Sequence, residues 1–407
     1  MPVDHGDARL VGLIRATVPA DQIVGVALSG GGDSVALLHV LRHAGVRVEA
    51  VTVDHRLRPD SAAEAAAVAA DCRALAVPHM VRVWDHGAVS GNLMDQARRA
   101  RMALIADWAR RRGIGVVALG HTRDDQAETL LMGLARAAGI DGLSGMRRSW
   151  TEGGVRFIRP LLKAGREELR DWLRAAGIGW IDDPTNDNDR FTRVRARAVL
   201  RALTPLGITT EGLASVATHL SQAQAALEAQ MAVAADQALR EEAGSLVLDR
   251  AAFLALPDEV RRRLIVAAIL WVSGADYPPR GDAVARVDAA IARGAQATLW
   301  GCRLGTGPRF LREAKAVSAV VATPDQLWDG RWVVEGPVTS DLEVRALGVA
   351  GLRQCPDWRK SGLPREVLAV TPAIWRGETL IAAPLAGCPN GWSARIAAPI
   401  HLFGLSH

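Results

Sequence analysis

The feature that most constrains the fold is an alternation of short apolar runs with helical patterns along the first half of the chain. Apolar runs of strand length occupy residues 23–28, 46–53, 80–84 and 114–119. Helical patterns lie between them at 34–42, 61–76 and 92–112, and a further helix is predicted at about 124–137. This alternation is typical of βαβ units with helices on both faces of a sheet. We therefore predict an α/β domain with a doubly wound parallel sheet.

The second half lacks this alternation. Helical patterns at 165–176, 210–243, 258–272 and 280–293 are followed, from about residue 295, by short strand-like segments between Gly and Pro. The length of 407 residues suits two or three domains at roughly 150 residues each. We predict an α/β domain over 1–205, a small helical domain over 206–294, and a small mixed or β-rich module over 295–407.

Composition excludes several classes of protein. The most apolar uncharged run, Leu264 to Ala275, has twelve residues, whereas a membrane-spanning helix needs about 20, so we expect a buried core helix there. No signal peptide is evident, and we expect a soluble protein of the cytoplasm. The four cysteines are far apart and form no CxxC pair, which argues against a zinc site, an iron–sulfur cluster or a disulfide framework. The net charge of +5 suits a polyanionic partner without requiring one.

A glycine-rich loop with the sequence SGGGDS lies between a predicted strand and a predicted helix. Successive glycines let backbone amides face a ligand, and the helix N-terminus adds its positive dipole end, so the loop suits phosphate. A tight strand-to-helix turn without a ligand is the alternative interpretation. A nucleoside triphosphatase P-loop needs a lysine that is missing here, and a carboxylate in its place suits a metal that bridges phosphates. The loop matches the PP-loop of ATP pyrophosphatases, so the predicted ATP-binding residues are Ser29, Gly30, Gly31, Gly32, Asp33 and Ser34, with Asp33 as a candidate magnesium ligand.

A second polar segment, GHTRDDQAETLLM, begins where the strand at 114–119 ends. In open parallel sheets the ligand crevice lies beyond the carboxyl ends of the strands, so this segment and SGGGDS are expected to face one cleft. Asp125 and Glu128 are three residues apart on a predicted helix and share one face, with His121 just before it. The acids could instead complement the helix dipole or cap the helix.

A third segment, DPTNDNDRFTRVRARAVLR, is rich in arginine. Five arginines follow Asp189 without an intervening acid, at positions Arg190, Arg193, Arg195, Arg197 and Arg201. Such a run is either a solvated helix face or a set of phosphate contacts.

Taken together, these segments resemble the bacterial tRNA(Ile)-lysidine synthetases. VALSGGGDS, VDHRLRPDSAAEA, GHTRDDQAETLLM, GIDGLSGM, RPLL and DPTNDNDRFTRVR occur in the order and spacing of that family and cover about residues 20 to 200. Residues 361–384 are similar to the end of some members. The chain departs from the family at Gly32, where other members often carry a larger residue.

The resemblance implies a reaction and its partners. Members bind ATP, magnesium, L-lysine and the tRNA(Ile) that carries a CAU anticodon. The wobble cytidine is adenylated with release of pyrophosphate, and lysine then displaces AMP to give lysidine. By this resemblance Asp33, Asp125 and Glu128 are the catalytic candidates, the latter two as lysine ligands or base. His121, Arg193, Arg195 and Arg197 would contact substrate, and residues 206–294 and 295–407 would bind and position tRNA. No membrane partner is expected, and a homodimer is left open.

Two other functions remain open at this point. One is another PP-loop ATP pyrophosphatase that acts on a different tRNA base or on a small molecule. RNA-thiolating relatives usually supply paired cysteines, and none lies near the predicted cleft, where Cys72 is a single cysteine in a predicted helix. The other is a nucleotide-sensing or RNA-binding module without catalysis.

Overall fold

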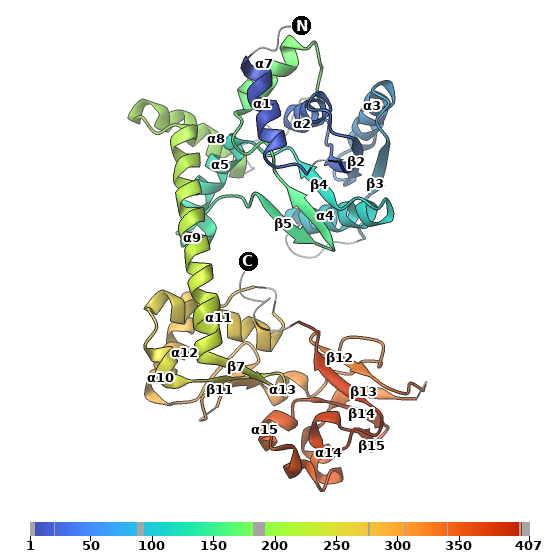
Figure 1. Ribbon diagram of the computed structural model, residues 1–407, viewed down its shortest axis with the longest axis vertical. Coiled ribbons are helices and arrows are strands. Elements are labelled where there is room, and N and C mark those ends of the chain that lie inside the picture. The colour runs from blue at the N-terminus through green and yellow to red at the C-terminus, as the bar shows by residue number, and fades with distance from the viewer. Residues whose placement is uncertain are drawn as a thin grey trace. The chain divides into compact units, whose positions relative to one another are not determined.

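The computed structural model describes residues 5–19, 21–87, 93–181, 192–275, 277–305, 307–339, 341–398 and 400. The chain forms two compact units, Met1–Gln224 and Ala225–His407 (Figure 1). Helix α9 (Thr210–Ala238) begins in the first unit and ends in the second. The division into three domains at 205 and 294 stays a prediction.

The first unit contains a six-stranded, mostly parallel sheet in the order β3-β2-β1-β4-β6-β5. The five parallel strands are β1 (Val24–Ala27), β2 (Val48–Asp54), β3 (His79–Val83), β4 (Val116–Leu119) and β6 (Val155–Ile158). Strand β5 (Ser149–Glu152) is antiparallel and forms a hairpin with β6 through Gly153 and Gly154. The predicted parallel sheet is confirmed, whereas this hairpin was not predicted because its four-residue strands are too short to show a period.

Helices cover both faces of this sheet, as a doubly wound fold requires. Helices α1 (His5–Arg15), α2 (Gly32–His43), α3 (Ser61–Ala74) and α7 (Arg166–Ala175) pack on one face. Helix α4 (Leu93–Arg111) packs on the other face (Figure 1). The described part of this unit also contains α5 (Arg123–Leu134), α6 (Ile140–Leu143), α8 (Thr192–Leu203) and the short η2 (Thr204–Leu206).

The second unit begins with helices and a five-stranded antiparallel sheet. The helices are α10 (Arg250–Leu254), α11 (Asp258–Ser273) and α12 (Gly281–Arg293). The sheet has the order β7-β8-β11-β10-β9, formed by β7 (Leu239–Glu242), β8 (Ser245–Leu248), β9 (Ala297–Leu299), β10 (Cys302–Leu304) and β11 (Arg309–Arg312). The predicted helix over 210–243 ends at Ala238 instead, because a turn at Ala243 and Gly244, both with positive φ, folds β7 back onto β8.

The last part of the chain contains two small antiparallel sheets. Strand β12 (Trp332–Glu335) pairs with β16 (Ser393–Ile396), and β13 (Glu343–Ala346) pairs with β14 (Pro372–Arg376), which pairs with β15 (Thr379–Ala382). Short helices accompany them: α13 (Ala314–Val317), α14 (Gly348–Gln354), α15 (Arg365–Leu368), η3 (Trp358–Ser361) and η4 (Pro384–Ala386). The prediction of a mixed, β-rich module is confirmed.

The apolar run Leu264–Ala275 falls mainly within α11, most of whose residues are buried in the core of the second unit. The prediction of a buried core helix is therefore confirmed. Among the described residues, no helix is both long enough and apolar enough to cross a membrane.

Candidate active site

The loop Ser29–Ser34 connects the carboxyl end of β1 to the first turn of α2. Gly30 has a φ of +86°, and a Cβ on it would lie 2.8 Å from side-chain atoms of Ile181 and Val68, so only glycine fits there. The Ser34 hydroxyl donates to the Gly31 carbonyl at 2.9 Å and accepts from the Ser29 amide at 3.1 Å. The two serine hydroxyls thus fix the shape of the loop, a role that the sequence did not predict.

The N-terminus of α2 is open to an anion. Gly31 is its N-cap and has no side chain to cap the first amides, so among the described residues these donors and the positive end of the helix dipole are left for a ligand. Asp33 lies in this first turn. Burial raises the pKa of Asp33 to about 6, although the nearby Arg166 opposes the shift.

The end of β4 approaches this loop closely. A Cβ on Gly120 would lie 2.8 Å from the backbone oxygen of Asp33 and 2.9 Å from Cα of Ser34. Only glycine allows this approach, which brings the segment that follows β4 against the loop. The expected convergence of the two motifs at one edge of the sheet is confirmed.

Asp125 caps a helix and also pairs with Arg166. Its Oδ2 accepts from the Thr122 amide at 2.7 Å and the Thr122 hydroxyl at 3.0 Å, which forms a capping box at the start of α5. Its Oδ1 accepts from Nη2 of Arg166 at 3.0 Å. The capping interpretation therefore holds for one oxygen of Asp125, and the other belongs to an ionic cluster.

A single guanidinium, that of Arg166, joins all three candidate catalytic acids. Its Nε donates to Asp33 at 3.2 Å, its Nη1 to Glu128 at 2.9 Å and its Nη2 to Asp125 at 3.0 Å. The backbone amide of Arg166 also donates to Oδ2 of Asp124 at 2.7 Å. Sequence reasoning missed Arg166, although a signal was available: a basic residue at the start of a helix opposes the helix dipole and needs a reason to be there.

Glu128 is the most deeply buried of these acids, with no exposed surface. Its Oε1 also accepts from Nε of Arg197 at 2.8 Å, which brings α8 to the cluster. Its Oε2 is buried and has no partner among the described residues. Arg193 and Arg195 are exposed on the same helix, while Arg190 and the segment DPTNDNDRF lie outside the described residues.

The charges of this cluster stabilise one another. Burial alone would raise the pKa of Asp125, but the charge of Arg166 and the hydrogen bond from the Thr122 amide favour the carboxylate and the pKa is lowered. Burial would lower the pKa of Arg166, but the charges of Asp125, Glu128 and Asp33 outweigh it and raise this pKa above its ordinary value. Asp125 and Arg166 are therefore both ionised at neutral pH.

His121 is neutral at physiological pH. Burial, followed by the charge of Arg159, lowers its pKa to about 3. Its Nδ1 lies 3.1 Å from Nε of Arg159 and accepts a hydrogen bond from it. His121 thus serves neither as an acid nor as a cation at pH 7.

Comparison with known proteins identifies the family. A model of the PP-loop domain matches residues 7–203. A tRNA(Ile)-lysidine synthase of Ruegeria pomeroyi is 47% identical over 400 residues, which cover 96% of each chain. The chain belongs to the tRNA(Ile)-lysidine synthase family. Relatives of the same name from Brucella anthropi and Zymomonas mobilis are 34% and 35% identical and cover 88% and 73% of this chain, and 84% and 90% of their own.

Membership of the lysidine synthase family confirms the resemblance drawn from the sequence. The residues of the candidate site also suit the predicted magnesium ion. No group of three or more His, Cys, Asp or Glu side chains that could hold a metal occurs in the described ranges. Asp33 beside the phosphate loop offers one carboxylate. Magnesium typically binds one or two carboxylates together with substrate phosphates and water, so this arrangement fits the ion.

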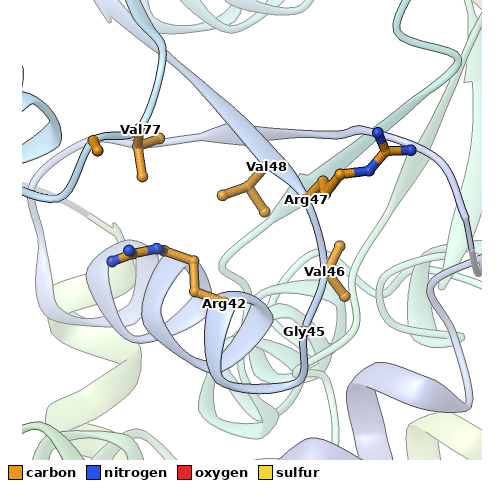
Figure 2. Close-up of a pocket in the computed structure, with 7 residues that line it drawn as sticks. Arg42, Gly45, Val46, Arg47, Val48 and Val77 are labelled. Atoms are coloured by element: carbon orange, nitrogen blue, oxygen red, sulfur yellow. The ribbon is translucent and has the colours of Figure 1, made fainter.

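One cavity among the described residues of this lysidine synthase homologue lies away from the candidate site. It has a volume of about 320 Å³ and is lined by Arg42, Gly45, Val46, Arg47, Val48, Ala76 and Val77 (Figure 2). These residues surround the amino end of β2, whereas the candidate site lies at the carboxyl ends of the strands. We assign this cavity no part in the reaction.

Proposed function

We propose that the protein ligates L-lysine to the wobble cytidine of tRNA(Ile) with a CAU anticodon. ATP adenylates the cytosine with release of pyrophosphate, and the lysine amine then displaces AMP to give lysidine. The observation that carries this proposal is the contact of Arg166 with Asp33, Asp125 and Glu128. It joins the phosphate loop to the acids of α5, so nucleotide and amine substrates would meet in one site.

The loop at β1 serves the nucleotide in this proposal. The uncapped amides of α2 and the loop glycines would bind the phosphates of ATP. Asp33 would hold magnesium, which offsets the charge of the phosphates during adenylation. Because no lysine follows the last glycine, cleavage between the α- and β-phosphates is expected rather than release of orthophosphate.

The acids of α5 would bind the lysine substrate in this proposal. Lysine carries two ammonium groups at neutral pH, and its site needs carboxylates. Glu128 Oε2 is a buried acceptor that no described residue satisfies, and an ammonium group would satisfy it. Asp125 is held ionised and would add counter-charge. One of the two carboxylates accepts the proton that the attacking amine loses.

The arginines of α8 and the second half of the chain would bind tRNA in this proposal. Arg193 and Arg195 are exposed on α8 and would bind phosphates, while Arg197 pairs with Glu128. Residues 206–294 would bind tRNA, and residues 295–407 would position it. We propose the cytoplasm as the place of action, since the substrate tRNA is found there.

A sulfur-transfer reaction on RNA is less compatible with the described residues. Cys72 lies on the buried face of α3, and burial raises the pKa of its thiol to about 11. Such a thiol is a poor nucleophile at neutral pH.

One assay tests the proposed reaction. The protein is incubated with α-labelled ATP, labelled lysine and a tRNA(Ile) transcript with a CAU anticodon, and the nucleosides are analysed by mass spectrometry. We expect AMP, pyrophosphate and lysidine in equal amounts. A transcript with uridine at the wobble position is the control and should give none. Formation of ADP and orthophosphate, or of AMP without modified cytidine, would refute the proposal.

A further inference from the structure

Four arginines near the candidate active site have no acidic partner within the part of the chain that the structure describes. Arg98 and Arg101 lie on α4, Arg159 follows β6, and Arg193 lies on α8. Helix α4 packs against β5 and β6. After burial, the charges of Arg98, Arg101 and Arg193 contribute to lowering the pKa of Arg159. The ion pairs of α4 that the structure describes engage Arg99, Arg110 and Arg111 instead.

Arg159 is buried, with 7% of its surface exposed, and is held in one position. Its Nη1 donates to the Arg147 carbonyl at 2.5 Å, and its guanidinium carbon lies 4.1 Å from the centre of the Trp150 ring. Burial and the neighbouring arginines lower its pKa to about 9. The nearby carboxylate of Asp125 is already bound to Thr122 and Arg166. A buried cation without a carboxylate partner indicates a site for an anion.

Arg101 is a second cation of this cluster with a hydrogen-bond donor that no described residue satisfies. Its Nε is buried and has no partner among the described residues. Burial, followed by the charges of Arg98 and Arg193, lowers its pKa to about 10. An oxyanion bound here would satisfy this donor and offset the repulsion between the guanidinium groups.

His121 adds a neutral donor to this cluster. Because its Nδ1 accepts a hydrogen bond from Arg159 and its pKa is about 3, the imidazole carries its proton on Nε2 at neutral pH. The cluster thus combines guanidinium groups with one N–H, a set of donors that matches a phosphate ester.

Aromatic rings lie at the same edge of the sheet. Trp84 follows β3, and its amide donates to the carbonyl of Asp54 at the end of β2 at 2.8 Å. The ring centres of Trp84 and His86 are 4.5 Å apart, and those of Trp84 and His55 are 5.9 Å apart. Helix α4, which carries Arg98 and Arg101, packs against β2, at whose carboxyl end these rings lie. After burial, the charge of Arg101 also contributes to lowering the pKa of His55.

The arginines of α4 are separate from the phosphate loop. That loop leads into α2, whose apolar side chains pack on one face of the sheet, while α4 packs on the other. Proteins bind the unstacked bases and the backbone of single-stranded RNA with an aromatic surface beside a cationic cluster.

We propose that these residues form a binding site for single-stranded RNA on the catalytic unit. A base next to the modified cytidine stacks on Trp84, and its backbone phosphate binds Arg98, Arg101 and Arg159. This inference rests on the proposed function for the identity of the RNA and extends it by assigning residues that contact the anticodon loop.

The test measures tRNA binding by the full-length protein, independently of catalysis. Dissociation constants for the tRNA(Ile) transcript are determined at several salt concentrations for Trp84→Ala, Trp84→Phe and Arg98→Ala, and ATP binding is measured without tRNA. Arg99→Ala is the matched control, because Arg99 is the next residue of α4 and pairs with Asp95 at 3.1 Å.

We expect Trp84→Ala to weaken tRNA binding by roughly fivefold to a hundredfold, the range for loss of one base stack, and Trp84→Phe to restore most of it. Arg98→Ala should reduce the slope of log affinity against log salt by about 0.7, as for one phosphate of a single strand. Arg99→Ala should change neither quantity, and ATP affinity should stay constant.

Unchanged tRNA affinity in Trp84→Ala and Arg98→Ala would overturn the inference. So would a loss of ATP affinity with tRNA affinity intact, because the arginines would then bind the phosphates of the nucleotide. If the wild type made no lysidine while the variants still lost RNA affinity, the proposed function would fail and this site would stand.

Discussion

Replacement of Arg166 by Met tests whether one guanidinium stabilises the whole acidic cluster. The substitution keeps an unbranched apolar stem but removes the charge that contacts Asp33, Asp125 and Glu128. The side chains of Arg166, Asp125 and Glu128 are only 12%, 8% and 1% exposed, so these are buried ion pairs with little solvent screening. Removing one partner of a buried pair costs about 3–5 kcal/mol, because the remaining charges are left uncompensated.

The melting temperature of the first unit should therefore fall by about 6–20 °C at pH 7.5. The fall in melting temperature caused by Arg166→Met should also depend on pH. In the native protein the lowered pKa of Asp125 contributes stability that is present above its unfolded pKa of 3.8 and is lost as the pH falls through the folded pKa. Without Arg166 the buried acids take up protons on folding, so the variant should approach the native protein as the pH falls from 7.5 to 5.

Scanning calorimetry at both pH values measures the effect, and Arg174→Met is the matched control. Arg174 lies on the same helix and pairs with Asp171 at 2.6 Å, but both side chains are more than half exposed. Its loss should cost less than about 1 kcal/mol. A similarly small loss for Arg166→Met, or a large loss that is the same at pH 5 and pH 7.5, would refute the assignment of Arg166 as the central counter-charge.

Four further predictions concern Asp33, Glu128 and Gly120. Because burial raises the pKa of Asp33 to about 6, tRNA-dependent pyrophosphate release should fall as the pH drops through 6, and Asp33→Ala should lower its rate at pH 7.5 by at least a hundredfold. The same raised pKa means that Asp33 contributes stability that is lost as the pH rises from about 4 to 6, and denaturant melts of Asp33→Asn should lack this decline. Glu128→Gln should weaken lysine binding by roughly tenfold to a hundredfold, while ATP binding and lysine-independent pyrophosphate release survive. If the variant lost adenylation and kept its lysine affinity, Glu128 would belong to the nucleotide site. Gly120→Ala should lower ATP affinity in equilibrium binding, because its Cβ would meet the backbone at Asp33, and unchanged affinity would show that the loop tolerates displacement.

The sequence by itself determined the parallel sheet and the position of the phosphate loop. Both follow from local patterns: continuous apolar runs in β1 and β4 between helical segments, and successive glycines at a strand-to-helix junction. Because parallel strands share one edge for their carboxyl ends, it also predicted that Asp33 and the acids of α5 would converge. The roles of the individual residues stay predictions.

Only the tertiary structure decided how these charges are paired. Arg166 contacts acids that lie 133, 41 and 38 positions away, and no local pattern encodes which of the many arginines will reach them. The hairpin of β7 and β8 was likewise invisible, since its four-residue segments show no period until a partner strand fixes their pairing. Periodicity reports which face of an element is buried, whereas ion pairs and cross-strand contacts depend on distances that arise when distant elements pack together.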